Sequence, residues 1–153
     1  MAKKLSPQLI AARKRMKAEQ KKILTVAAEE AVQFFQDNFS EREGFLDTRV
    51  RKWKPRKRED KTFKTKGTKR GILIGPGGGT LWRSISRTSL NSKRTVIGIK
   101  GSKPQKYASV HNYGLRAGRG KGFKMPKRQF MGESKTLNRK IVRLIKKRIK
   151  KIL

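Results

Sequence analysis

The sequence contains no cysteine and a single histidine, His111. Without cysteine the chain has no disulfide framework, no thiolate metal site and no thiol nucleophile. One histidine does not build a histidine-based zinc site, because such a site takes several imidazole or carboxylate ligands. These absences argue against redox and zinc chemistry, and we expect neither a cofactor nor a metal.

Acidic residues and long apolar runs are also scarce. The 153 residues include ten Asp and Glu against 43 Lys and Arg, which gives a formal net charge of +33, and 34% of the residues are hydrophobic. No apolar run approaches the 18 or more residues of a membrane span, and the first residues lead into a helical pattern instead of a signal peptide. We therefore expect a protein made in a cytoplasm, with one domain and a modest core. Self-repulsion at this charge favours a chain that works within an assembly, against anions or acidic surfaces.

The first forty residues are predicted to form a long helix. Ser6 and Pro7 give a start signal, because a capping hydroxyl precedes a proline at the first helical position. Asp37 to Ser40 has the composition of a helix end. Residues 1–22 are basic with little to bury, so we interpret them as a helical extension. The core-facing stripe follows helical spacing and consists of Leu24, Ala28, Ala31, Val32, Phe35 and Phe39, widened by Ile23, Ala27 and Phe34.

A second helix is predicted at the C-terminal end. It begins after Ser134 as N-cap, and residues 135–153 carry nine Lys and Arg and no acid. Leu137, Ile141 and Ile149 lie on one helical face, so this helix is amphipathic and basic.

The middle of the chain divides into basic segments and short elements. Residues 49–70 show no period of 2 or 3.6, and we interpret them as an extended, flexible basic arm. Residues 114–124 read as a flexible loop of Gly, Arg and Lys. The short elements that we predict are one or two helical turns at 81–85, a hairpin of strands 86–90 and 95–99, a break at 101–104, a helix at 107–113 capped by Gly114, and an edge strand within 124–131.

The predicted fold is α+β. A small antiparallel sheet combines with the long N-terminal helix, the C-terminal amphipathic helix and the extended basic arms. Residues 23–153 form one domain, which the 1–22 extension precedes.

Two motifs could suggest chemistry. Gly75 to Gly79 lacks the Lys-Ser/Thr of a phosphate-binding loop, so a flexible connector is the better interpretation. His111 could act as a base for Ser109 or Ser84, but no acid that could orient it lies within twenty residues on either side. We interpret it as a structural histidine and predict no enzyme.

The basic stretches point to an anionic partner without identifying it. Lysines and arginines interleaved with aromatics suit phosphate backbones, since each neutralised phosphate releases counter-ions. The same composition suits acidic protein partners and, on the C-terminal helix, an anionic membrane surface. The candidates for contact with nucleic acid or an acidic partner are Arg51, Lys52, Lys54, Arg56, Arg116, Arg119 and Lys121.

Five blocks, in their order and spacing, resemble the phage virion morphogenesis (tail completion) family. They are Trp53-Lys54-Pro55, Gly79 to Ile85, Val96 to Gly98, Tyr107 to Gly114 and Pro126 to Gly132. The positions that match the family's signature residues are Trp53, Tyr107, His111, Gly114, Arg128 and Phe130.

The resemblance implies a structural virion protein at the tail end or the head–tail junction, acting as a ring of identical subunits without catalytic residues. The implied partners are further copies of the chain and other neck or tail proteins, with no membrane, and the excess of basic charge adds packaged DNA as a partner. It would reside in the virion and, during assembly, in the host cytoplasm. In this interpretation Trp53, Tyr107 and Phe130 pack the core or a subunit contact, and Arg128 pairs with a carboxylate. The alternative is a non-sequence-specific nucleic-acid-binding protein of the ribosome-associated or packaging type, in which the basic segments follow phosphates.

Overall fold

The computed structural model describes residues 6–55, 71–74, 79–91 and 93–151. Its longest element is helix α1 (Pro7–Ser40), which spans about 51 Å at 1.5 Å per residue. The Ser6 side chain accepts a hydrogen bond from the Leu9 amide, so the predicted N-cap is confirmed. The predicted helix end at Ser40 is confirmed as well.

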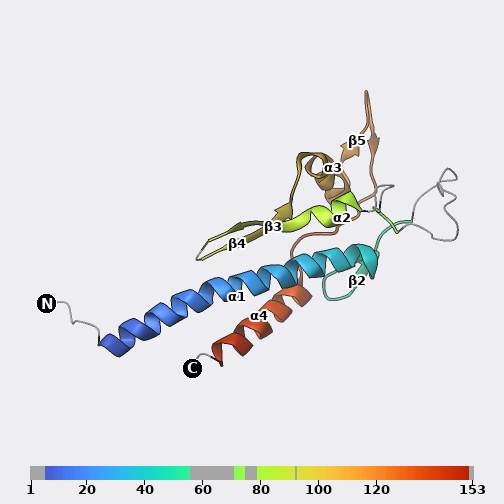
Figure 1. Ribbon diagram of the computed structural model, residues 1–153. Coiled ribbons are helices and arrows are strands. Elements are labelled where there is room, and N and C mark those ends of the chain that lie inside the picture. Colours follow the sequence, from blue (N-terminus) through green and yellow to red (C-terminus); the bar gives the residue numbers. More distant parts are fainter. Residues whose placement is uncertain (1–5, 56–70, 75–78, 92, 152–153) are drawn as a thin grey trace.

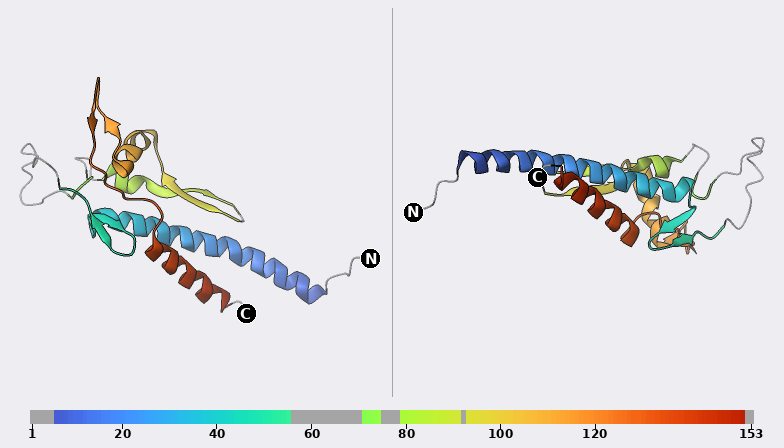
Figure 2. Two further views of the ribbon diagram at one scale, coloured as in Figure 1. Left: turned by 180° about the vertical axis from the view of Figure 1, so that it is seen from behind. Right: turned by 90° about the horizontal axis from the view of Figure 1, so that it is seen from below.

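Helix α1 lies between two other elements. The hairpin of β3 (Ile85–Leu90) and β4 (Thr95–Ile99) packs on one side of it, and helix α4 (Lys135–Ile149) packs on another (Figures 1 and 2). Helix α4 runs back toward the N-terminal end of α1. The first half of α1 extends beyond the hairpin, which leaves that part of the helix largely exposed.

The strands of the described residues form three separate antiparallel pairs and no larger sheet. Besides β3–β4, strand β1 (Gly44–Leu46) pairs with β2 (Val50–Lys52), and β5 (Arg116–Ala117) pairs with β6 (Phe123–Lys124). The α+β class is confirmed, with hairpins in place of one small sheet.

Two short helices lie over the β3 end of the molecule. Helix α2 (Thr80–Ser84) gives the predicted helical turn before β3. Helix α3 (Ser102–Tyr113) ends at Gly114 as predicted but begins five residues earlier than expected. The predicted break of the hairpin is confirmed, since β4 ends at Ile99, but residues 102–104 already belong to α3. Pro104 is the third residue of α3, within the first turn, where a proline displaces no intrahelical hydrogen bond.

The core forms where α1 meets the strands and the segment before α4. Phe39 is its centre, with ring centroids 5.3 Å from Trp53 and 5.2 Å from Phe130. From Ala27 to Phe39 the predicted stripe of α1 is buried, with Val32 partly buried. Other buried members of the cluster are Phe34, Phe45, Leu81, Ile85 and Leu137.

The basic segments are more structured than predicted. The arm expected at 49–70 starts later, because Val50–Lys52 forms β2 and Trp53 is buried; residues 56–70 lie outside the described residues. The pairing of β1 with β2 requires glycine at position 44, since a Cβ on Gly44 would lie 2.5 Å from the Arg51 carbonyl oxygen. The expected loop at 114–124 contains the β5–β6 hairpin. The edge strand expected within 124–131 is wrong, since residues 125–131 form no strand and their amides serve other partners.

No helix in the described part of the chain combines the length and apolar character that a membrane span requires.

Candidate assembly interface

The segment before α4 is held by two buried asparagines. The Asn112 side-chain oxygen, on α3, accepts hydrogen bonds from the Phe130 amide at 2.9 Å and the Met131 amide at 3.1 Å. Asn38, on α1, donates from Nδ2 to the Phe130 carbonyl at 2.9 Å. Helices α1 and α3 therefore both fix the backbone of Phe130. Through this shared contact with Phe130, helices α1 and α3 are held in position relative to each other.

Trp53 and Arg128 join the end of β2 to the same segment. The Trp53 indole N–H donates to the Gln129 carbonyl at 2.7 Å. The buried Arg128 guanidinium donates to the Lys54 carbonyl at 3.1 and 3.2 Å and reaches the Pro55 carbonyl at 3.5 Å. These bonds place the beginning of the basic segment after β2. The carboxylate partner predicted for Arg128 stays a prediction.

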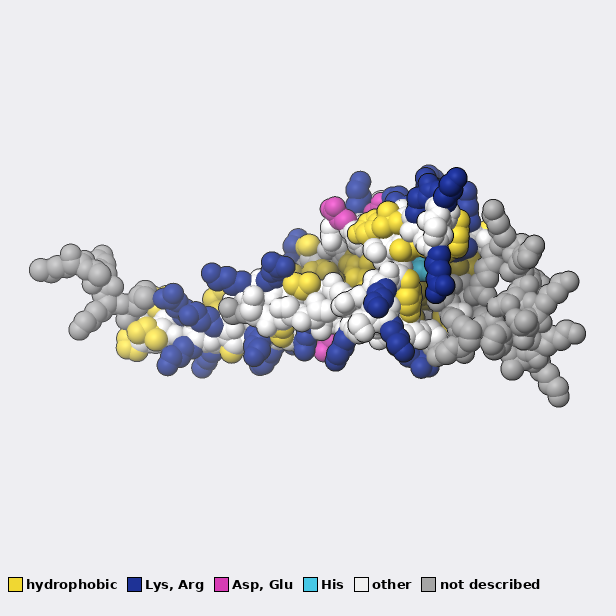
Figure 3. Space-filling view, turned by 90° about the horizontal axis from the view of Figure 1, so that it is seen from above, with side chains coloured by type: hydrophobic (Ala, Val, Ile, Leu, Met, Phe, Trp, Pro, Cys, Tyr) yellow, Lys and Arg dark blue, Asp and Glu magenta, His cyan; other side chains and the backbone are white. Residues whose placement is uncertain are grey.

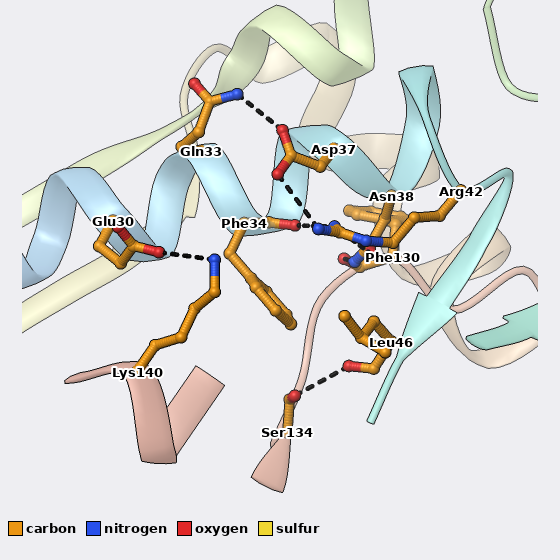
Figure 4. A network of polar contacts seen from close by, with 10 residues as sticks. All are labelled: Glu30, Gln33, Phe34, Asp37, Asn38, Arg42, Leu46, Phe130, Ser134 and Lys140. Carbon is orange, nitrogen blue, oxygen red and sulfur yellow. Dashed lines mark hydrogen bonds and ion pairs between the residues drawn. The ribbon is translucent and has the colours of Figure 1, made fainter. Parts of the chain in front are cut away.

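A polar network fixes α4 against α1 (Figure 4). Arg42 pairs with Asp37 at 3.2 Å and lies 5.0 Å from the centroid of the Phe34 ring. Lys140 on α4 pairs with Glu30 on α1 at 3.0 Å. Ser134 donates to the Leu46 carbonyl at 2.8 Å and accepts from the Leu137 amide, which confirms it as the predicted N-cap of α4. Helix α4 is thus tied to both α1 and β1.

His111 lies half-buried on α3, with its ring centroid 6.1 Å from that of Tyr107. Burial lowers the pKa of His111, and the neighbouring Arg128 guanidinium lowers it further. Its Nδ1 has no hydrogen-bond partner among the residues that the structure describes. Gly114 ends the same helix at φ 73°, and a Cβ there would lie 3.0 Å from the Lys127 backbone. His111 and Gly114 therefore shape the packing of α3 on the segment 125–131.

Two exposed apolar surfaces remain outside this core. The first, which we call the helical surface, lies on the projecting half of α1 and on α4 and comprises Leu9, Ile10, Met16, Val142 and Ile149. The second, at the β5–β6 hairpin and its base, comprises Tyr113, Leu115 and Phe123. Hydrophobic side chains gather at the end of α1 and again around the hairpin in Figure 3.

The residues predicted to contact an anion lie in different environments: some pair within the chain and others are exposed. Arg51 pairs with Asp47 at 3.0 Å, and the Lys52 ammonium donates to the Arg42 carbonyl at 2.7 Å. Lys54 is exposed next to Trp53, and Arg56 lies outside the described residues. Arg116, Arg119 and Lys121 come together on the β5–β6 hairpin, all exposed. A further cationic groove, lined by Arg15, Lys22, Arg148 and Lys151 with Glu19, lies between α1 and the end of α4.

Sequence reasoning missed the two asparagines. Asn38 was interpreted only as part of a helix end, and Asn112 lies inside the Tyr107 to Gly114 block without being singled out. Their partner is 92 residues from Asn38 and 18 from Asn112, so no local pattern reveals it. Within the described residues, no cluster of three or more His, Asp or Glu could hold a metal ion.

Comparison with known proteins identifies a family. The comparison with curated proteins found no significant match, and neither did the comparison with solved structures. The model of the phage virion morphogenesis family matches residues 3–150. That range includes the asparagine contacts, the helical surface and the β5–β6 hairpin. The chain therefore belongs to the phage virion morphogenesis family.

Proposed function

We propose that this chain is a non-catalytic structural protein of the virion that completes the tail or joins the tail to the head, and that it works as a ring of identical subunits. The observation that carries the proposal is the helical surface. Leu9 is 58% exposed and Met16 63% exposed, although both continue the side of α1 that becomes the core stripe. Exposed apolar residues at the end of α1, with others on the neighbouring helix α4, favour a protein partner.

The β3–β4 hairpin supports the same conclusion. A two-stranded hairpin is marginally stable by itself and presents unpaired backbone groups at its outer edges. In the described part of the chain no third strand covers either edge. A neighbouring subunit would supply the missing contacts.

The kind of symmetry follows from the difference between the surfaces. The helical surface lies at one end of the elongated molecule, and the base of the β5–β6 hairpin, with Tyr113 and Leu115, lies toward the other (Figures 1 and 2). A contact at the base of the hairpin would leave its cationic turn free. Contact between unlike surfaces is head-to-tail, and such contacts close into rings when the rotation permits. A ring is therefore the assembly that these surfaces favour.

Substitution of the helical surface tests the proposal. We expect nuclease-treated wild-type protein in high salt to form a discrete oligomer by light scattering and rings by negative stain. The Leu9→Glu/Met16→Glu variant should be monomeric, because two carboxylates would be desolvated in the subunit contact.

Ala11→Glu is the matched control for Leu9→Glu alone, since it adds the same charge two residues on, on the opposite side of α1 and outside the groove that Ala18 lines. It should retain the oligomer. A wild-type protein that is monomeric alone and in the presence of tail or head particles would contradict the proposal.

A further inference from the structure

We propose that the β5–β6 hairpin, residues 114–124, binds the phosphate backbone of double-stranded DNA without reading its sequence. The hairpin projects from the body beside α3 (Figures 1 and 2). Viewed end-on, this part of the molecule shows clustered Lys and Arg side chains (Figure 3). The inference does not depend on ring formation.

The hairpin concentrates positive charge that no acidic residue in the described part of the chain neutralises. Arg116, Arg119, Lys121 and Lys124 are all exposed. No Asp or Glu occurs between Asp60 and Glu133, and no ion pair of the described residues includes a hairpin residue. These cations are available to an anion from outside.

The register of β5 and β6 places two positive charges opposite each other, which destabilises the hairpin. Arg116 lies directly opposite Lys124 in the register of β5 and β6. Like charges directly opposite each other destabilise an antiparallel pair. The Arg116 guanidinium is held back over the loop, where it donates to the Lys121 carbonyl at 3.0 Å. A bound polyanion would attract both side chains and offset the repulsion between them.

The hairpin has a defined shape, which glycines permit. Gly122 has φ 55°, and a Cβ on it would lie 2.7 Å from the Ala117 carbonyl oxygen. Its amide donates to the Arg119 carbonyl at 3.1 Å and closes a turn. The Phe123 ring lies within 3.4 Å of where a Cβ on Gly118 would be, so it covers one side of the turn. The cations are therefore presented on a narrow, preformed ribbon.

Duplex DNA fits this ribbon better than an acidic protein does. Two strands are about 4.8 Å apart, and the DNA major groove, about 12 Å wide, admits a two-stranded ribbon. Phosphates line both sides of that groove at high density, which matches cations carried on both strands. Residues 114–124 contain no Asn, Gln, Asp or Glu, so the side chains that read adenine and cytosine edges are missing. The Arg and Lys present can contact guanine as well as phosphates, and their number and spread over the hairpin favour phosphate contacts.

The test compares two triple variants with equal loss of charge. Arg116→Gln/Arg119→Gln/Lys121→Gln removes the hairpin cations. Arg139→Gln/Arg143→Gln/Lys147→Gln removes two Arg and one Lys from an exposed row on α4. Binding of a short DNA duplex is measured by fluorescence anisotropy over a range of salt concentrations. Circular dichroism verifies that both variants are folded.

We expect the hairpin variant to lose about 2.7 units of the slope of log affinity against log salt, because each phosphate contact contributes about 0.9. Its affinity at about 0.1 M salt should fall about 500-fold. The α4 control should lose less than one unit of slope. Two duplexes of unrelated sequence should bind the wild-type protein equally.

The proposal is overturned if the slope lost by the hairpin variant does not exceed that of the control by about one unit, the contribution of a single phosphate. It is also overturned if the wild-type protein binds duplex DNA without salt dependence, or binds an acidic polypeptide in preference to DNA. The oligomer measured by light scattering should be the same for the hairpin variant and the wild type. Loss of the oligomer therefore bears on the ring, and loss of DNA binding on this site.

Discussion

Replacing Asn112 by alanine tests whether the asparagine contacts hold the fold together. The Asn112 oxygen accepts hydrogen bonds from two amides, those of Phe130 and Met131. Phe130 is buried and Met131 is half-buried, so the substitution leaves one amide without a partner and away from water, and a second with partial access to water. At about 1–3 kcal/mol for each buried unsatisfied group, the expected loss in the free energy of unfolding is about 2–4 kcal/mol. For a chain of this size the melting temperature should fall by roughly 10 °C.

The assay is urea unfolding followed by the fluorescence of Trp53 and Trp82, at one protein concentration for all variants. Asn112→Asp is the control, because a carboxylate retains both acceptor positions and should lose less stability than Asn112→Ala. Asn38→Ala should combine with Asn112→Ala non-additively, since both side chains hold the backbone of Phe130. A loss below about 1 kcal/mol for Asn112→Ala would refute the reasoning, because it would equal a single solvated hydrogen bond.

Three further predictions concern the neighbouring residues. Trp53→Phe should lower the free energy of unfolding by about 1–2 kcal/mol, because the Gln129 carbonyl loses its indole donor; unchanged urea stability would contradict this. The lowered pKa of His111 means that the unfolded chain binds its proton first as pH falls, so stability should decrease from pH 7 to pH 5, and His111→Gln should flatten that profile. Gly114→Ala should cost about 2 kcal/mol by calorimetry, because of the left-handed backbone and the close approach to Lys127; a neutral effect would show that the helix end can relax.

Local patterns predicted the helices well. Ser6 and Ser134 act as N-caps because a side-chain oxygen needs only the amide three residues on, and this geometry is visible in sequence. The stripe of α1 is equally local. The projecting half of the same helix was also visible, because its charge leaves it little to bury.

The short hairpins depended on contacts that sequence periodicity does not carry. Val50–Lys52 has the composition of a solvated arm, yet the close approach at Gly44 and the burial of Trp53 make it a strand. The β5–β6 pair arises from left-handed glycines that a flexible loop would also contain. Likewise, the site residues Trp53, Arg128 and Phe130 could be named, but their partners lie far along the chain. Trp53 and Arg128 donate to backbone carbonyls 73 to 76 residues away, and the Phe130 carbonyl accepts from the Asn38 side chain, 92 residues away.

The central claim is that this chain is required to complete the virion. The most direct measurement is electron microscopy of particles assembled when the gene carries an early stop codon, with the wild-type chain supplied from a plasmid as the control. The account predicts separate heads and tails, or tails with an unfinished end, and complete particles once the wild-type chain is supplied. Intact, infectious virions assembled without the chain would contradict it.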